Sequence, residues 1–162
     1  MNTIEADFSA LVAEVAEGLI AREALLVTAE SCTGGWIAKV CTDRSGSSAW
    51  FDRGFVTYSN AAKQELLGVP EALIAQHGAV SRPVVEAMAA GALTRSAARY
   101  SIAVSGIAGP GGGTPDKPVG TVWLAWGTPA GVSTVCAHFP GDREQVRAAS
   151  VAAALRGLLE RL

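Results

Sequence analysis

The stretch Thr28-Ala-Glu-Ser-Cys-Thr-Gly-Gly35 combines hydroxyl, carboxylate and thiol groups with two glycines at the point where an apolar run ends. The run before it, Leu25 to Val27, is typical of a buried strand, and the apolar residues from Trp36 to Val40 have helical spacing. A strand, a tight turn and a helix start are therefore expected. A nucleophile in this turn would lie beside the free N–H groups of the helix N-terminus. Ser31 is the candidate nucleophile, and Cys32 is the alternative.

A serine hydroxyl needs a neighbouring base to take its proton before it attacks a carbonyl. Lys63 is the candidate base, because it follows the expected helix N-cap Asn60 closely and the positive end of a helix disfavours an ammonium. A partly desolvated, neutral lysine serves this role in serine–lysine hydrolases, whereas a solvated surface lysine is the alternative. Tyr58 would orient the lysine or pass protons, or else belong to the core. For His77 and His138, structural roles are favoured over a role in a catalytic triad.

Two further groups of residues are candidates for substrate binding. Thr33, Gly34 and Gly35 would form an oxyanion hole from backbone N–H groups, with a helix start that needs small residues as the alternative. A loop rich in glycine and proline, residues 105–118, would wrap a phosphate or ribose with backbone donors, or be a plain connection. Arg143, in the first turn of the last predicted helix, would meet a phosphate, or be a solvated surface charge. The loop residues of interest are Ser105, Gly106 and Gly109.

The elements that must position these residues alternate between helical and strand patterns. Asp142 and Gln145 resemble a capping box that opens the last helix, and two strand patterns near the C-terminus form a hairpin. This mixture predicts a single domain, residues 1–162, with a three-layer α/β/α sandwich over a mixed β-sheet. The predicted helices cover residues 7–22, 36–40, 60–67, 71–77, a segment that starts after Ser81 and a segment that starts after Asp142. The predicted strands cover residues 25–27, 50–58, 100–104, 119–127 and 132–139.

Composition excludes several classes of protein. Apolar residues make up 49% of the chain and charged residues 17%, so we expect a self-association surface, with a dimer as the simplest homo-oligomer. A net charge of −2 without a run of basic residues does not indicate a surface that binds nucleic acid. No segment has the apolar length of a membrane span. Three cysteines without metal-site spacing and an N-terminus without signal-peptide features predict free thiols, no metal or other cofactor, and a cytoplasmic protein.

A set of motifs, taken in order along the chain, resembles the CinA C-terminal domain family. The match covers the chain from about residue 8 to its C-terminus. The motifs are Thr28-Ala-Glu-Ser-Cys-Thr-Gly-Gly35, Gly46-Ser-Ser48, Gly54-Phe-Val-Thr-Tyr-Ser-Asn60 with Lys63, Gly78-Ala-Val-Ser81, Gly106-Ile-Ala-Gly-Pro110 and Lys117-Pro-Val-Gly-Thr121. The segment 111–116 is a variable part of this pattern.

The resemblance implies hydrolysis of the carboxamide of nicotinamide mononucleotide to the carboxylate and ammonia, a step in pyridine-nucleotide recycling. It also implies that Ser31 is the nucleophile and Lys63 the base, with Tyr58, Thr33 and Ser48 in the site. A catalytically silent nucleotide-binding module is one alternative function. An interaction protein related to competence or DNA damage is another.

Overall fold

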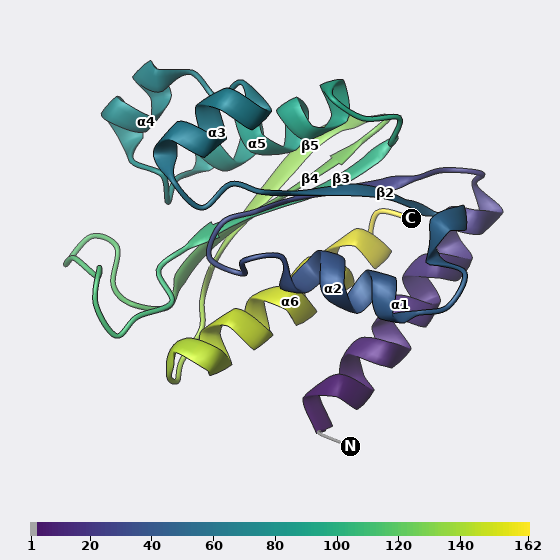
Figure 1. The fold of residues 1–162 in the computed structure, drawn as a ribbon. Helices are drawn as coiled ribbons and strands as arrows, with labels where there is room; N and C mark the ends of the chain where they lie inside the picture. Colours follow the sequence, from purple (N-terminus) through teal and green to yellow (C-terminus); the bar gives the residue numbers. More distant parts are fainter. Residues whose placement is uncertain (1–2) are drawn as a thin grey trace.

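The computed structural model describes the backbone of residues 3–162 and the side chains of residues 8–162. At its centre lies a five-stranded sheet with the strand order β2-β1-β3-β4-β5 (Figure 1). Strand β1 runs parallel to β2 and β3, whereas β4 is antiparallel to both β3 and β5. The predicted mixed sheet is confirmed. The strands are β1 (Leu26–Glu30), β2 (Phe51–Val56), β3 (Tyr100–Gly106), β4 (Thr121–Thr128) and β5 (Gly131–His138).

Helices cover both faces of the sheet, which confirms the predicted three layers (Figure 1). One face carries α1 (Thr3–Ala21), α2 (Trp36–Asp43) and α6 (Arg143–Leu159), and the other carries α3 (Asn60–Leu67), α4 (Glu71–His77) and α5 (Arg82–Thr94). Successive strand residues alternate between the two cores: Leu26 packs with the first set of helices and Val27 with the second. None of the helices in the described part of the chain is both long and apolar enough to cross a membrane.

The first turns of two helices show how well local capping signals predict boundaries. The Asp142 side chain accepts a hydrogen bond from the N–H of Gln145, and the Gln145 side chain bonds back to the Asp142 N–H, so the predicted capping box is confirmed. The predicted N-cap of α3 is wrong by one residue. Ser59 is the cap, since its Oγ accepts from the N–H of Ala62. Serine and asparagine are equally good caps, so residue type alone does not favour Ser59 over Asn60. Asn60 is therefore the first residue of α3 and not its cap.

The carboxyl ends of β1, β2 and β3 meet at one edge of the sheet. Glu30, the last residue of β1, pairs with Val56 of β2 and with Val104 of β3. The pairing continues past the strands, because the N–H of Ser31 donates to the Val104 carbonyl and the N–H of Thr57 donates to the Glu30 carbonyl. The segments that follow these strands therefore start side by side.

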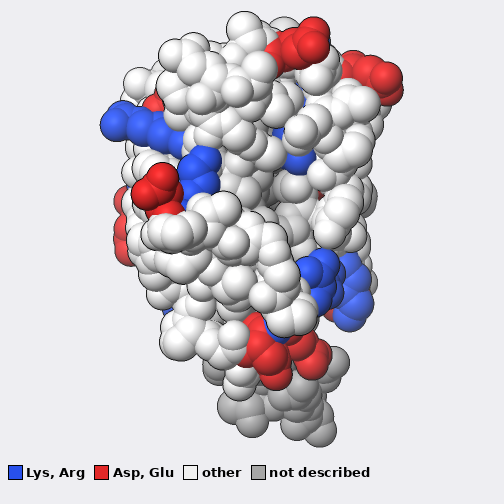
Figure 2. Space-filling view, turned by 90° about the vertical axis from the view of Figure 1, so that its left-hand side faces the viewer, with Lys and Arg blue, Asp and Glu red and all other residues white. Residues whose placement is uncertain are grey.

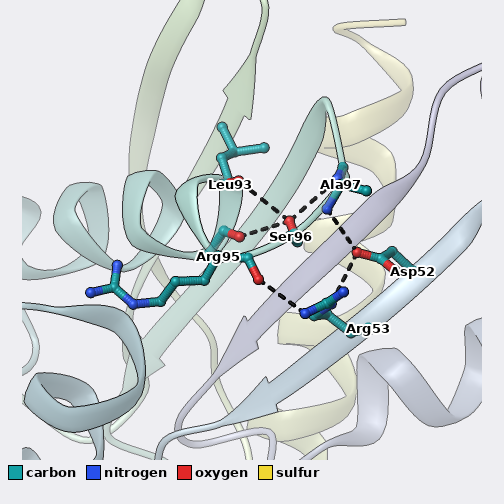
Figure 3. A network of polar contacts seen from close by, with 8 residues as sticks. Asp52, Arg53, Leu93, Arg95, Ser96 and Ala97 are labelled. Atoms are coloured by element: carbon teal, nitrogen blue, oxygen red, sulfur yellow. Dashed lines mark hydrogen bonds and ion pairs between the residues drawn. The ribbon is translucent and has the colours of Figure 1, made fainter.

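The opposite edge of the sheet is held by polar contacts at the start of β2 (Figure 3). A carboxylate oxygen of Asp52 accepts from Nε of Arg53 and from the N–H of Ala97, at 3.0 and 3.1 Å. Nη1 of Arg53 donates to the carbonyl of Arg95, just after α5. These bonds tie the outer strand to the turn between α5 and β3 and so fix where β2 begins.

Helix α5 approaches the C-terminal end of α3 closely at Gly91. A Cβ at this position would lie 2.0 Å from the carbonyl oxygen of Leu67, so only glycine fits. Leu67 is the last residue of α3, the helix that carries Lys63. The glycine therefore sets the position of the lysine-bearing helix against α5.

Candidate active site

Ser31 and Lys63 meet at the carboxyl edge of the sheet. Ser31 follows β1 directly, and Lys63 lies in the first turns of α3, which follows β2. Nζ of Lys63 lies 3.0 Å from Oγ of Ser31. The two residues that the sequence proposed as nucleophile and base are thus in hydrogen-bond contact.

The environment of the lysine amine disfavours its charged form. The Lys63 side chain is buried, and its Nζ donates to the carbonyl oxygens of Thr57 and Tyr58 at 2.9 and 3.1 Å. Burial lowers the pKa of Lys63 below its ordinary value of 10.5. The sequence predicted a lowered pKa from the helix N-terminus together with partial desolvation, and removal from water is the main cause.

The turn that carries Ser31 is built around the buried side chain of Glu30. One carboxylate oxygen accepts from Oγ1 of Thr33 at 2.6 Å and from the N–H of Ile37 at 2.9 Å, and the other accepts from the N–H of Ala38 at 3.0 Å. The N–H groups of Ile37 and Ala38, in the first turn of α2, are thus satisfied by a carboxylate at the end of β1 and not by a side chain at the N-cap. Glu30 therefore holds the turn that carries Ser31.

The same contacts account for one of the N–H groups that the sequence proposed as oxyanion donors. The Glu30 carboxylate accepts hydrogen bonds from the N–H groups in the first turn of α2, and the N–H of Gly34 donates to the carbonyl of Ser31 at 3.0 Å. The N–H of Gly34 thus closes the turn, and those of Ile37 and Ala38 bind the Glu30 carboxylate. None of the three residues proposed for the oxyanion hole lines the pocket beside Ser31: Thr33, Gly34 and Gly35.

Cys32, the alternative nucleophile, belongs to the hydrophobic core. Its exposed fraction is 6%, and it packs with the residues beneath α1, α2 and α6. Burial raises the pKa of the Cys32 thiol to about 11, so the thiolate is scarce at neutral pH. Ser31 is therefore the better nucleophile of the two.

A pocket of about 230 Å³ opens beside the Ser31–Lys63 pair. Figure 2 shows the corresponding face of the molecule, with a hollow near its centre that is bordered mostly by uncharged atoms. The described residues that line the pocket include no histidine and no carboxylate, and its basic side chains are Lys63 and Arg143. The lining residues are Ser31, Cys32, Tyr58, Asn60, Lys63, Ala79, Val80, Ser105, Gly106, Ala108 and Arg143.

Arg143 lies at this pocket, where it joins two other residues proposed from the sequence. Its Nη1 donates to the carbonyl of Gly109 at 2.8 Å, and its Nη2 donates to Oη of Tyr58 at 3.3 Å. The Tyr58 side chain is 63% exposed, and its hydroxyl contacts Arg143 rather than the serine or the lysine. The glycine-rich loop thus supports the arginine through a backbone carbonyl.

Ser105 and Gly106 reach the pocket as the end of β3. The Ser105 hydroxyl donates to the carbonyl of Ala79 at 2.8 Å, which ties the strand to the segment before α5. Ser48, in contrast, does not come to the site. It is exposed in a short 3-10 helix, Ser47–Ala49, just before β2, and so at the opposite edge of the sheet from Ser31. Its placement in the site, which only the family resemblance implied, is wrong.

Several residues near the pair escaped the sequence analysis. Asn60, which the sequence assigned to the helix cap, lines the pocket, and so do Ala79 and Val80 from the connection between α4 and α5. Small apolar residues in a connection carry no functional signal. Arg147 of α6 reaches the nucleophile turn from 114 residues away, and no motif could have indicated this contact. The described residues contain no group of three or more His, Cys, Asp and Glu side chains that could hold a metal ion.

The fold and the site together define an α/β/α sandwich with a buried serine–lysine pair at the carboxyl edge of its mixed sheet. The chain belongs to the CinA C-terminal domain family, whose model matches residues 8–162.

Relatives and solved structures agree with this assignment. The chain is 54% identical over 155 residues to a protein of Escherichia coli strain K12 named nicotinamide-nucleotide amidohydrolase PncC, with 95% of this chain and 94% of that protein covered. It is 57% identical over 150 residues to a Pseudomonas putida protein of the same name, covering 93% and 94%. The crystal structure of the competence/damage inducible protein CihA from Agrobacterium tumefaciens superimposes with a TM-score of 0.93 at 44% identity, covering 95% and 94%.

Proposed function

We propose that this chain is a nicotinamide-nucleotide amidohydrolase, which hydrolyses the carboxamide of nicotinamide mononucleotide to nicotinate mononucleotide and ammonia. The observation that carries the proposal is the contact between Ser31 Oγ and Lys63 Nζ at the pocket. The names of relatives that are 54% and 57% identical supply the substrate. The pocket is of a size suited to part of a nucleotide, and its lining carries the guanidinium of Arg143 without any carboxylate.

Three contacts of Lys63 match the needs of a neutral amine. An uncharged –NH₂ has two N–H donors and one lone pair. The donors fit the carbonyls of Thr57 and Tyr58, and the lone pair then accepts the hydroxyl proton of Ser31. Burial favours this neutral form. Lys63 is therefore arranged to act as general base toward Ser31.

Hydrolysis then proceeds in two halves. Ser31 Oγ attacks the carboxamide carbon while its proton passes to Lys63, and the lysine returns this proton to the departing nitrogen as the C–N bond breaks. Ammonia leaves, and the acyl group stays on Ser31 as an ester. Water then attacks the ester with Lys63 as base, the carboxylate product is released, and Ser31 recovers its proton. The net reaction consumes one water and needs no cofactor.

The negative charge that develops on the carbonyl oxygen needs a hydrogen-bond donor. The N–H of Cys32 is our candidate, because it belongs to the residue after the nucleophile, as in the strand–turn–helix sites of other hydrolases. This N–H takes no part in the backbone hydrogen bonds that close the turn. Arg143 is our candidate for the substrate phosphate, since a guanidinium pairs with phosphate by charged hydrogen bonds.

The experiment is an assay of ammonia released from nicotinamide mononucleotide. Ser31→Ala and Lys63→Ala are expected to abolish release, whereas Cys32→Ala retains it. Full activity of Ser31→Ala would refute the mechanism. Tight binding of the nucleotide by calorimetry, without turnover by the unmodified protein, would instead identify a silent nucleotide-binding module.

Location and assembly complete the proposal. We place the enzyme in the cytoplasm, which agrees with free thiols at Cys32, Cys41 and Cys136. We expect a homo-oligomer, with a dimer as the simplest assembly, because the described residues expose seven large apolar side chains. Light scattering during gel filtration tests this expectation. The exposed residues are Ile20, Val56, Tyr58, Leu66, Val119, Val132 and Val135.

A further inference from the structure

Arg147, a half-buried residue of α6, holds the backbone of the nucleophile turn. Its Nε donates to the carbonyl oxygen of Cys32 at 3.0 Å, and its Nη2 donates to that of Thr33 at 3.2 Å. Its guanidinium carbon lies 5.6 Å from the ring centroid of Trp36, the first residue of α2. One side chain thus contacts the two residues that directly follow Ser31 and the helix that starts after them.

These two bonds restrict the peptide groups next to the nucleophile. A peptide unit is planar, so fixing a carbonyl also fixes the N–H of the next residue. Arg147 therefore orients the units between Cys32 and Thr33 and between Thr33 and Gly34. The bonds carry a charged donor, which makes them stronger than bonds between neutral groups. Glu30 holds the same turn through Oγ1 of Thr33, so the turn is tied by two separate side chains.

We propose that Arg147 is a positioning residue, which holds the turn so that Ser31 Oγ faces Lys63 Nζ. Arg147 touches neither member of this pair and acts only through the backbone of the turn. The inference rests on the proposed role of Ser31 as nucleophile. It adds a residue that neither the motifs nor the comparisons indicate.

Arg161, which lies just after the end of α6, provides a matched control. Its guanidinium carbon lies 4.0 Å from the ring centroid of Trp126, and its nitrogens donate to Oγ of Ser133 and to the carbonyl of Gly157. Both arginines are half-buried, stack on a tryptophan and donate hydrogen bonds. Only Arg147 reaches the nucleophile turn.

The test compares Arg147→Met, Arg147→Lys and Arg161→Met. Methionine keeps the length and apolar stem of arginine but donates no hydrogen bond, so kcat of Arg147→Met should fall about 10- to 100-fold, as expected for a displaced reacting group. KM for the nucleotide should change by less than about 2-fold, because Arg147 lies outside the pocket lining. Lysine can bond one carbonyl and should recover part of kcat. Arg161→Met should keep the rate of the unmodified protein.

A second readout follows Ser31 without the amidase reaction. A fluorophosphonate phosphonylates activated serines, with fluoride as the leaving group, so its labelling rate at Ser31 should fall in Arg147→Met by a factor similar to that in kcat. All rates are measured below the melting temperature of every variant, so that only folded protein is compared. Unchanged kcat and labelling in Arg147→Met, or an equal loss in Arg161→Met, would overturn the proposal. If the unmodified protein is labelled but releases no ammonia, the proposed substrate is wrong while the positioning role is still tested by labelling.

Discussion

Lys63 Nζ lies 3.0 Å from Ser31 Oγ although 32 positions separate the two residues in the chain. They meet because β1 and β2 are parallel neighbours that end at the same edge, so the residues after each strand start side by side. The turn after β1 presents the serine, and the helix after β2 presents the lysine. The pair is thus a product of strand order and register, and it depends on every contact that fixes α3 and the turn.

The activity should rise with pH through the lowered pKa of Lys63. The neutral amine is the active form, so kcat falls below this pKa and reaches a plateau above it. Because burial lowers the pKa, the midpoint should lie clearly below 10.5. We expect this rise with pH in kcat measured at saturating substrate, so that titration of Lys63 is separated from titration of the substrate phosphate. A midpoint at 10.5, or activity that increases toward acid, would contradict a neutral lysine base.

Arg143→Gln should weaken binding of the phosphorylated substrate. Loss of a charged hydrogen bond to phosphate predicts a KM for nicotinamide mononucleotide that is raised about 10-fold or more. The KM for nicotinamide riboside, which lacks the phosphate, should change little. Arg44→Gln is the control, since Arg44 is exposed after α2 and outside the pocket lining. Equal effects on both substrates would show that Arg143 acts through Tyr58 or the Gly109 loop instead.

Glu30→Gln should destabilise the fold. The buried carboxylate accepts three hydrogen bonds, and an amide replaces one of its oxygens with a donor that faces an N–H or O–H. We expect the free energy of unfolding to fall by about 3 kcal/mol, measured by urea denaturation.

The control for this loss is Glu86→Gln, which removes an exposed ion pair with Arg82 on the surface of α5. Pairs of this kind contribute little, so the change should stay below about 0.5 kcal/mol. Similar changes in the two variants would mean that Glu30 does not hold the turn.

Gly91→Ala should displace the helix that carries the lysine. The new methyl group would lie 2.0 Å from the Leu67 carbonyl oxygen, so α3 or α5 must move. Overpacking of this kind costs about 1–3 kcal/mol of stability, and kcat should fall as Lys63 moves from Ser31. Gly111→Ala, where a Cβ would meet nothing within 4 Å, should change neither quantity. Normal kcat in a folded Gly91→Ala protein would show that α3 tolerates the shift.

The sequence predicted the layers, the C-terminal hairpin and the serine–lysine pair, because these depend on periodicity and on short motifs. It did not rank Ser59 above Asn60 as a cap, since the two types are equivalent at that position. Ser48 was misplaced because a motif beside a strand does not reveal which end of the sheet it occupies. Arg147 was missed because its partners are backbone carbonyls, which leave no trace in residue type. Contacts with backbone atoms of distant segments can be identified only from the folded structure.

Helix α6 carries Arg143 and Arg147 four positions apart, hence on one face and separated by about 6 Å along the axis. The first reaches the pocket and the second reaches the nucleophile turn. Because a helix moves as a unit, a shift of α6 along its axis would displace the contact at the pocket and the contact at the turn together.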